Sequence, residues 1–429
     1  MNRLLAIGAL SLMLQIRLKT GFVLLRPFEF LVLAALFVEV SRAGGRSFRL
    51  PVGLMILVPY FFWHFISAGT ISMGNGAREF LQIGVVATFA FLLAQETRPA
   101  NINRLQHTLL WGMILIMAGV IVWHVHHGYW VGWKQLPDPR LVFTMVPALL
   151  AGIILFSRPE KQHRLWLVWV ALGPVLLLSG ERKAVVIYLF LTALMLARGR
   201  MVAITATAMG GFAALFVLST LVDNPYLQKQ MHTLVDPTGG GDYKYVIELG
   251  RYRPDDTPSA VQRSFAFAIS KELIAEHPMF GVGTNEYEKI INQRFAVLPA
   301  DLRLGIHGEF QRVLTENGIL GLTLYIFIWI VSWVRVRGVL RRALGQHLIS
   351  DVQKRVLPLL IFVPLALYLA SEAPGSRSFV ALIVISLLPE LVSRSLVNRS
   401  QTAMVPSRLA DKLLARRGIS SVNIARIHS

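Results

Sequence analysis

The amino-acid sequence predicts an all-α integral membrane protein with about 12 transmembrane helices, because its apolar runs approach the roughly 20 residues that a crossing needs. Of the 429 residues, 54% are hydrophobic and only 16% are charged. Soluble proteins carry about 25% charged residues. The basic residues also gather in the loops on one side of the predicted helices. Composition, run length and charge placement therefore agree on this fold class.

The apolar runs define the helices in chain order. Both faces of each run are apolar, which favours a helix in a membrane over the alternating pattern of a strand. A β-barrel is therefore disfavoured. The predicted spans are residues 4–16, 28–41, 51–69, 80–96, 107–126, 141–157, 164–180, 183–197, 201–222, 318–334, 355–371 and 378–393.

The strong positive charge follows from topology. The chain has a formal net charge of +19, with 43 Lys and Arg residues against 24 Asp and Glu residues. If both termini are cytoplasmic, more than half of the basic residues fall in cytoplasmic loops and in the tail, as the positive-inside rule requires. The basic excess therefore reflects orientation in the membrane and does not indicate a nucleic-acid partner.

One long polar segment separates the predicted helices into two groups. Long ordered loops in compact proteins are usually functional, and this one becomes helical in pattern from Ser259 to Glu276. We expect nine transmembrane helices at 1–222, a large extracytoplasmic loop at 223–317, three more helices at 318–393 and a basic cytoplasmic tail at 394–429.

Two arginines on the outer side are candidates for binding an anion. Arg182 lies in the turn Ser179–Lys183 between two predicted helices, and Arg263 lies near the start of the loop helix. A guanidinium group donates bidentately and stays charged, so two of them from separate segments can hold a diphosphate. The alternatives are a loop charge that reaches lipid headgroups at Arg182 and a helix-surface charge at Arg263.

His307 is the candidate general base. It directly precedes a short amphipathic helix that Gly318 is expected to end. The positive end of a helix dipole disfavours imidazolium and keeps the ring neutral near pH 7. A neutral imidazole can accept a proton. The alternative is an ordinary capping or interfacial histidine.

The sequence contains no convincing metal or nucleotide site. There are no cysteines, which excludes thiolate ligands and nucleophiles. His124, His126 and His127 lie among tryptophans typical of a membrane interface. Asp255 and Asp256 could bind a divalent cation, but adjacent loop acids are more often solvated. The stretch Gly281–Gly283 lacks a preceding strand and a third glycine, so it predicts a turn rather than a nucleotide loop.

Several of these residues together resemble a known family. The run His307-Gly308, nine residues, Gly318, two residues, Gly321 resembles the signature that follows the large periplasmic loop of O-antigen ligases and related polymerases. Upstream, His277–Gly283 resembles the His-Pro-apolar-x-Gly-x-Gly stretch of the family, and Arg182 and Arg263 fall where it carries arginines. Gly308 departs from the family, which most often has asparagine there.

The resemblance implies a GT-C-like fold and a metal-independent glycosyltransferase of the bacterial inner membrane. It would transfer polysaccharide from an undecaprenyl-diphosphate-linked O-antigen donor to a sugar of the lipid A core, on the periplasmic face and without a cofactor. His307 would deprotonate the acceptor while Arg182 and Arg263 stabilise the departing diphosphate. Lys183, Arg251 and Arg253 are lesser candidates for this contact.

Other activities remain alternatives at this stage. An O-antigen polymerase or a protein-glycosylating ligase of the same superfamily would share these residues and differ only in the acceptor. A glycosyltransferase with a catalytic carboxylate in the first outer loop is disfavoured, since Arg17–Pro27 contains no acid. A lipid or sugar transporter is disfavoured by the absence of repeated halves and by the scarcity of charges deep within the spans.

Overall fold

The fold is described from a computed structural model of the chain. It describes most of the region before the large loop in separate helical pieces, the second half of the loop, and the helices that follow it. Its residues are 18–20, 23–25, 27–43, 51–69, 81, 83–89, 91–92, 108–119, 122, 140–157, 159–178, 182–198, 200, 202–203, 210, 259–297, 303, 305–371, 381–393 and 396.

The regular elements among the described residues are helices, apart from one short hairpin. The strands β1 (Leu18–Thr20) and β2 (Val23–Leu25) pair antiparallel, with Lys19 opposite Leu24. This hairpin was not predicted and modifies the all-α expectation in one place. The labelled helices are α2 (Pro27–Ala43), α3 (Val52–Gly69), α6 (Arg140–Phe156), α7 (Pro159–Leu178), α8 (Arg182–Leu196), α12 (Ser259–Glu276), α13 (Tyr287–Arg294), α14 (Glu309–Gly345) and α15 (Asp351–Ser371).

The helices α2, α3, α6, α7, α8 and α15 coincide closely with predicted spans. Within the described residues, two helices are long and apolar enough to cross a membrane, Glu309–Gly345 and Asp351–Ala370. Several helices contain proline, such as Pro59 in α3 and Pro358 in α15, which membrane helices tolerate. This is the architecture of a helical membrane protein. The number of 12 spans stays a prediction, as do the segment boundaries.

Helix α14 is longer than its predicted span of 318–334. It consists of two helical segments joined at Gly318, where the backbone is non-helical (φ 68°, ψ −170°). The first segment begins at Glu309, which agrees with the expected short helix that Gly318 ends. The second segment continues past Arg335 to Gly345. The helix therefore extends beyond the apolar stretch into a segment that contains several arginines.

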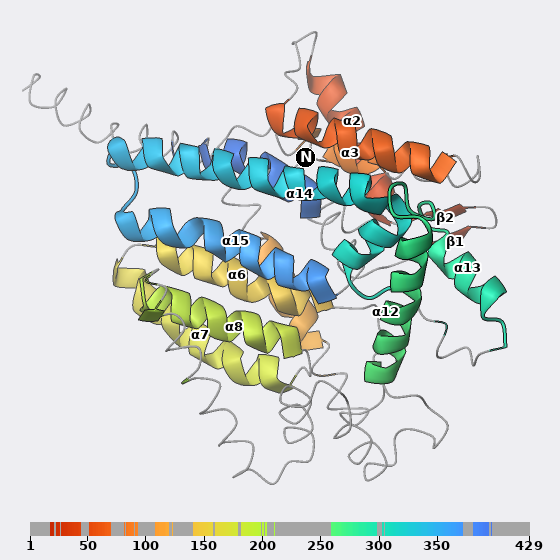
Figure 1. Ribbon diagram of the computed structural model, residues 1–429. Coiled ribbons are helices and arrows are strands. Elements are labelled where there is room, and N and C mark those ends of the chain that lie inside the picture. The colour runs from red at the N-terminus through yellow and green to blue at the C-terminus, as the bar shows by residue number, and fades with distance from the viewer. Residues whose placement is uncertain are drawn as a thin grey trace, which may run out of the picture.

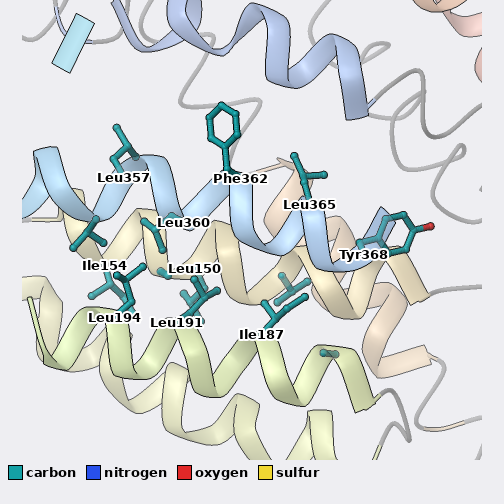
Figure 2. Close-up of a cluster of buried hydrophobic side chains, with 14 of the residues drawn as sticks. Leu150, Ile154, Ile187, Leu191, Leu194, Leu357, Leu360, Phe362, Leu365 and Tyr368 are labelled. Atoms are coloured by element: carbon teal, nitrogen blue, oxygen red, sulfur yellow. The ribbon is translucent and has the colours of Figure 1, made fainter. Parts of the chain in front are cut away.

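Side by side, α14, α15, α6, α8 and α7 form a layered stack, with α2 and α3 on the far side of α14 (Figure 1). Side chains from α6, α8 and α15 fill the centre of the stack (Figure 2). Leu150, Ile187, Leu191 and Leu360 are each at most 2% exposed there. We call this centre the apolar stack. Close packing of this kind holds helices together by dispersion contacts.

A second core joins α2 and α3 to α14. Tyr60 of α3 packs edge-on against Tyr325 of α14, with ring centroids 5.4 Å apart, and both are almost fully buried. At the N-terminal end of α3, the Glu390 carboxylate accepts a hydrogen bond of 3.0 Å from the Gly53 amide and pairs with Arg335. Together these contacts fix α14 against α3 along its length.

The described part of the large loop has a small core of its own. Ile269 and Leu273 of α12 pack with Tyr287 and Ile291 of α13 and with Ile306. Burial raises the pKa of Tyr287 to about 12, so the phenol stays neutral and donates to the Ala266 carbonyl at 3.3 Å. The loop therefore forms a packed unit. In Figure 1, α12 runs across the direction of α14 and α15.

Candidate functional site

The turn that follows α12 is joined to α14 through the backbone. At the break in α14, the amides of Ile319 and Leu320 donate to the carbonyls of Pro278 (2.9 Å) and Met279 (3.4 Å). In return, the carbonyls of Thr315 and Glu316 accept from the amides of Val282 (3.0 Å) and Gly283 (2.9 Å). In an unbroken helix, the amides of residues 319 and 320 would bond the carbonyls of 315 and 316. The turn therefore replaces the hydrogen bonds that the break removes.

Two glycines make this close approach possible. Gly281 and Gly318 have φ values of +70° and +68°, and such sparsely populated backbone conformations cost other residues about 1–3 kcal/mol. A Cβ on Gly281 would overlap the backbone of Glu316, and one on Gly318 would overlap that of Met279. Each glycine thus accommodates the segment that carries the other. We call the contact between Pro278–Gly283 and Thr315–Leu320 the glycine junction.

Buried side chains tie the glycine junction to α3. The Asn317 amide donates to the Thr284 hydroxyl at 2.8 Å, and that hydroxyl donates to the His64 carbonyl at 3.3 Å. The Trp63 indole donates to the Asn317 carbonyl at 3.1 Å. A Cβ on Gly321 would overlap Asn317 and crowd Trp63. Gly281, Gly318 and Gly321 therefore lie where the loop, α14 and α3 contact one another.

The first segment of α14 carries a buried cluster of charges. Arg312 donates to both carboxylate oxygens of Glu309, through Nε at 3.0 Å and through one Nη at 2.7 Å. Its remaining nitrogen lies 3.5 Å from Glu316. The side chains of Glu309, Glu316 and Arg312 are 1%, 6% and 12% exposed. Removing one member of such a cluster leaves an uncompensated buried charge, so this segment has little freedom to shift.

His307 lies between two anchored neighbours. Before it, Ile306 is buried in the loop core. After it, Gly308 is the N-cap residue of α14, with extended backbone (φ −101°, ψ 130°). A Cβ on Gly308 would lie 2.8 Å from the Ala370 carbonyl of α15. Because Gly308 has no side chain, the His307 segment can pass close to the end of α15. His307 itself is half-buried.

The start of α8 reaches the same end of α15. Arg182 is the first residue of α8, and the ammonium of Lys183 lies 5.6 Å from the centre of the Tyr368 ring. Tyr368 is at the C-terminal end of α15 (Figure 2). Because Gly308 approaches Ala370 on that end, the structure gathers the start of α8 and the His307 segment around it.

The remaining predicted residues lie either on the exposed surface of α12 or outside the described residues. Arg263 is exposed on the second turn of α12, and the described contacts do not join it to the His307 segment. Arg251, Arg253, Asp255, Asp256 and the histidines 124, 126 and 127 lie outside the described residues. Within the part of the chain that the structure describes, no group of three His, Cys, Asp or Glu side chains could hold a metal ion.

Sequence reasoning missed several residues that lie around the His307 segment. Glu309, Arg312 and Glu316 follow the spacing at which helical neighbours form ion pairs, and this pattern could have singled them out. Tyr368 and Ala370 carried no such signal, since only the packing of α15 against α14 and α8 brings them to the site. Gly281–Gly283 was predicted as a turn. The structure places the turn at Pro278–Phe280, and Gly281–Gly283 form the irregular backbone that directly follows it.

The fold and this site define the class: a helical membrane protein whose loop is locked onto a broken helix. The particular family follows from sequence comparison. Residues 166–326 match the O-antigen ligase family, and this match supports membership of the O-antigen ligase superfamily. The family is one of glycosyltransferase-like enzymes. No curated protein matches the chain.

Proposed function

We propose that this protein is an O-antigen ligase of the bacterial inner membrane. It transfers polysaccharide from undecaprenyl diphosphate to a sugar of the lipid A core on the periplasmic face, and both of its termini are cytoplasmic. The observation that carries the proposal is the family match over 166–326, because this region contains Arg182, Arg263 and His307 together.

The proposed reaction is a single displacement. His307 accepts the proton of the acceptor hydroxyl, and that oxygen attacks the anomeric carbon of the donor sugar. The bond from this carbon to the diphosphate breaks, and its electron pair stays on the diphosphate oxygen. Attack from the face opposite the leaving group inverts the anomeric configuration. No metal ion takes part, so a chelator should leave the rate unchanged.

Arg182 and Arg263 bind the departing diphosphate, assisted by Lys183, Arg251 and Arg253. The position of α8 supports this assignment, since its first residues lie at the end of α15 that the His307 segment approaches. Arg263 comes from a different element, α12, which packs against α14. One donor aimed at developing charge contributes roughly 3–4 kcal/mol to transition-state stabilisation.

The test is complementation of a ligase-null strain, read as lipopolysaccharide banding on gels. Wild type should restore capped lipopolysaccharide, whereas His307→Ala, Arg182→Ala and Arg263→Ala should not, at equal membrane expression. His163→Ala and Arg164→Ala are matched controls, since both residues are exposed on α7 and predicted to face the cytoplasm.

Three outcomes would contradict parts of the proposal. Full activity of His307→Ala would remove the general base. A wild type that inserts correctly but caps no lipopolysaccharide would point to another acceptor, as in a polymerase or a protein-glycosylating ligase, or to transport. Retention of configuration in the product, read from the anomeric proton coupling, would exclude the single displacement.

A further inference from the structure

The glycine junction places an apolar turn at the depth where α14 enters the membrane. No charged residue lies between Glu316 and Arg335 of α14. The helical stretch from Ile319 to Arg335 spans about 24 Å at the usual rise per residue, and the hydrocarbon core is about 30 Å thick. With Arg335 at the inner boundary, Ile319 and Leu320 therefore lie at or below the outer boundary, and so does the turn bonded to their amides.

The exposed side chains of this turn are large and apolar. Met279 is 55% exposed and Phe280 is 63% exposed. Next to them on α14, Ile319 and Leu320 are 48% and 38% exposed. This apolar surface continues along α14 through exposed residues such as Phe327. A water-facing loop seldom displays neighbouring exposed groups of this size.

The backbone of the turn suits a medium without water. Hydrocarbon offers no partner to a free amide or carbonyl, so a broken helix in a membrane requires internal replacements. The glycine junction supplies them at Thr315, Glu316, Ile319 and Leu320. Phe280 also packs on Trp63 of α3, with ring centroids 5.6 Å apart, and tryptophan is enriched at membrane interfaces.

Polar residues limit how deeply the turn can enter. Glu276 and His277, directly before Pro278, are both exposed, and Glu276 is hydrogen-bonded to Arg294 of α13. Charged groups of this kind stay in water or among the headgroups. The boundary therefore falls between the end of α12 and Pro278, which makes the insertion shallow.

We propose that the turn Pro278–Gly283 is embedded in the outer leaflet, where Met279 and Phe280 contact the acyl chains of the surrounding phospholipids. The large loop is thereby anchored to the bilayer as well as to α14. Since α12 leads directly into the turn, the anchor sets the height of α12 above the membrane. The proposal stands apart from the enzymatic reaction and does not depend on it.

Single cysteines can test the contact directly, because the natural chain has no cysteine. Met279→Cys and Phe280→Cys would carry nitroxide labels in purified protein reconstituted into phospholipid vesicles that contain no polyprenyl lipid. Phe327→Cys on the exposed face of α14 is the control for acyl-chain contact, and Lys271→Cys on the exposed face of α12 is the control for water. Power saturation compares collisions with oxygen, which concentrates in hydrocarbon, and with a water-soluble nickel complex.

We expect labels at 279 and 280 to resemble the label at 327, with oxygen collisions several-fold more frequent than nickel collisions. Labels at both positions that behave like the label at 271 would overturn the proposal. Met279 makes the measurement robust, since its cysteine variant leaves the Phe280–Trp63 contact intact. Because the vesicles lack polyprenyl lipid, a hydrocarbon-like signal identifies phospholipid chains as the contact.

Discussion

The apolar stack and the glycine junction hold helices together in different ways. In the apolar stack, leucines and isoleucines of α6, α8 and α15 share one core, so each contact is one of many. In the glycine junction, backbone groups of two segments bond each other directly, and two positions exclude a side chain altogether. The apolar stack should therefore tolerate small changes in side-chain size. In the glycine junction, one added methyl group should disrupt the packing of the two segments.

The largest effect should follow from an added methyl group in the glycine junction. Gly318→Ala introduces backbone strain at a positive φ and a Cβ that overlaps the backbone of Met279, and we expect a loss of about 3–5 kcal/mol in stability. Gly338→Ala on the same helix is the control, since its Cβ would meet nothing within 4 Å. Thermal unfolding in detergent would compare them. Equal melting temperatures would refute the role assigned to Gly318.

A smaller effect should follow from a cavity in the apolar stack. Leu360→Ala removes a side chain that is 1% exposed, and we expect a loss of roughly 2–4 kcal/mol. Leu167 of α7 is 69% exposed, so Leu167→Ala should change the melting temperature little. If both variants melt alike, dispersion packing of the stack contributes less than we infer.

A single polar contact in the glycine junction should contribute less again. Asn317→Ala removes the hydrogen bond to Thr284 and the packing of a side chain that is 1% exposed. We expect a loss of about 1–3 kcal/mol. Asn292, an exposed residue of α13, provides the matched alanine control. Faster hydrogen exchange of the amides at 282 and 283 would locate the change, and unchanged exchange there would contradict it.

The smallest effect concerns pH and the surface of the loop. The hydrogen bond from Arg294 lowers the pKa of Glu276 below its ordinary value of 4.5. A lowered pKa in the folded state gives a stabilisation that is present above pH 4.5 and lost as pH falls through the folded-state value. We expect exchange in α12 and α13, relative to the intrinsic rate at each pH, to rise as the pH falls below 4.5. Arg294→Gln should abolish this rise, and a rise that persists in the variant would exclude the pair as its cause.

Much of the architecture could be predicted because the membrane imposes strong rules on sequence. Apolar runs located α3 and α6 to within a few residues, and the positions of Gly318 and His307 predicted the short helix between them. The hairpin β1–β2 escaped prediction because six paired residues carry too little periodicity. The extension of α14 escaped it because Arg335 and its neighbours ended the apolar pattern without ending the helix.

The candidate site could be predicted only in part. The residue types with suitable chemistry, His307 and Arg182, were recognisable in the sequence because a base and a permanent cation are chemically distinctive. Their surroundings were not, because the ends of α8 and α15 are brought to the His307 segment by packing between segments far apart in the chain. Arg263 remains a prediction whose relation to His307 the described contacts leave open.

The sequence by itself determined the membrane fold, the candidate base and arginines, and the resemblance to O-antigen ligases, because these depend on composition, spacing and side-chain chemistry. Only the tertiary structure decided what the glycines do. From the sequence, Gly281 was predicted to lie in a turn and Gly318 to end a helix. In the structure, each glycine leaves room for the backbone of the segment that carries the other. The linear sequence does not reveal this mutual constraint, because it arises only when two segments that are distant in the chain come into direct backbone contact.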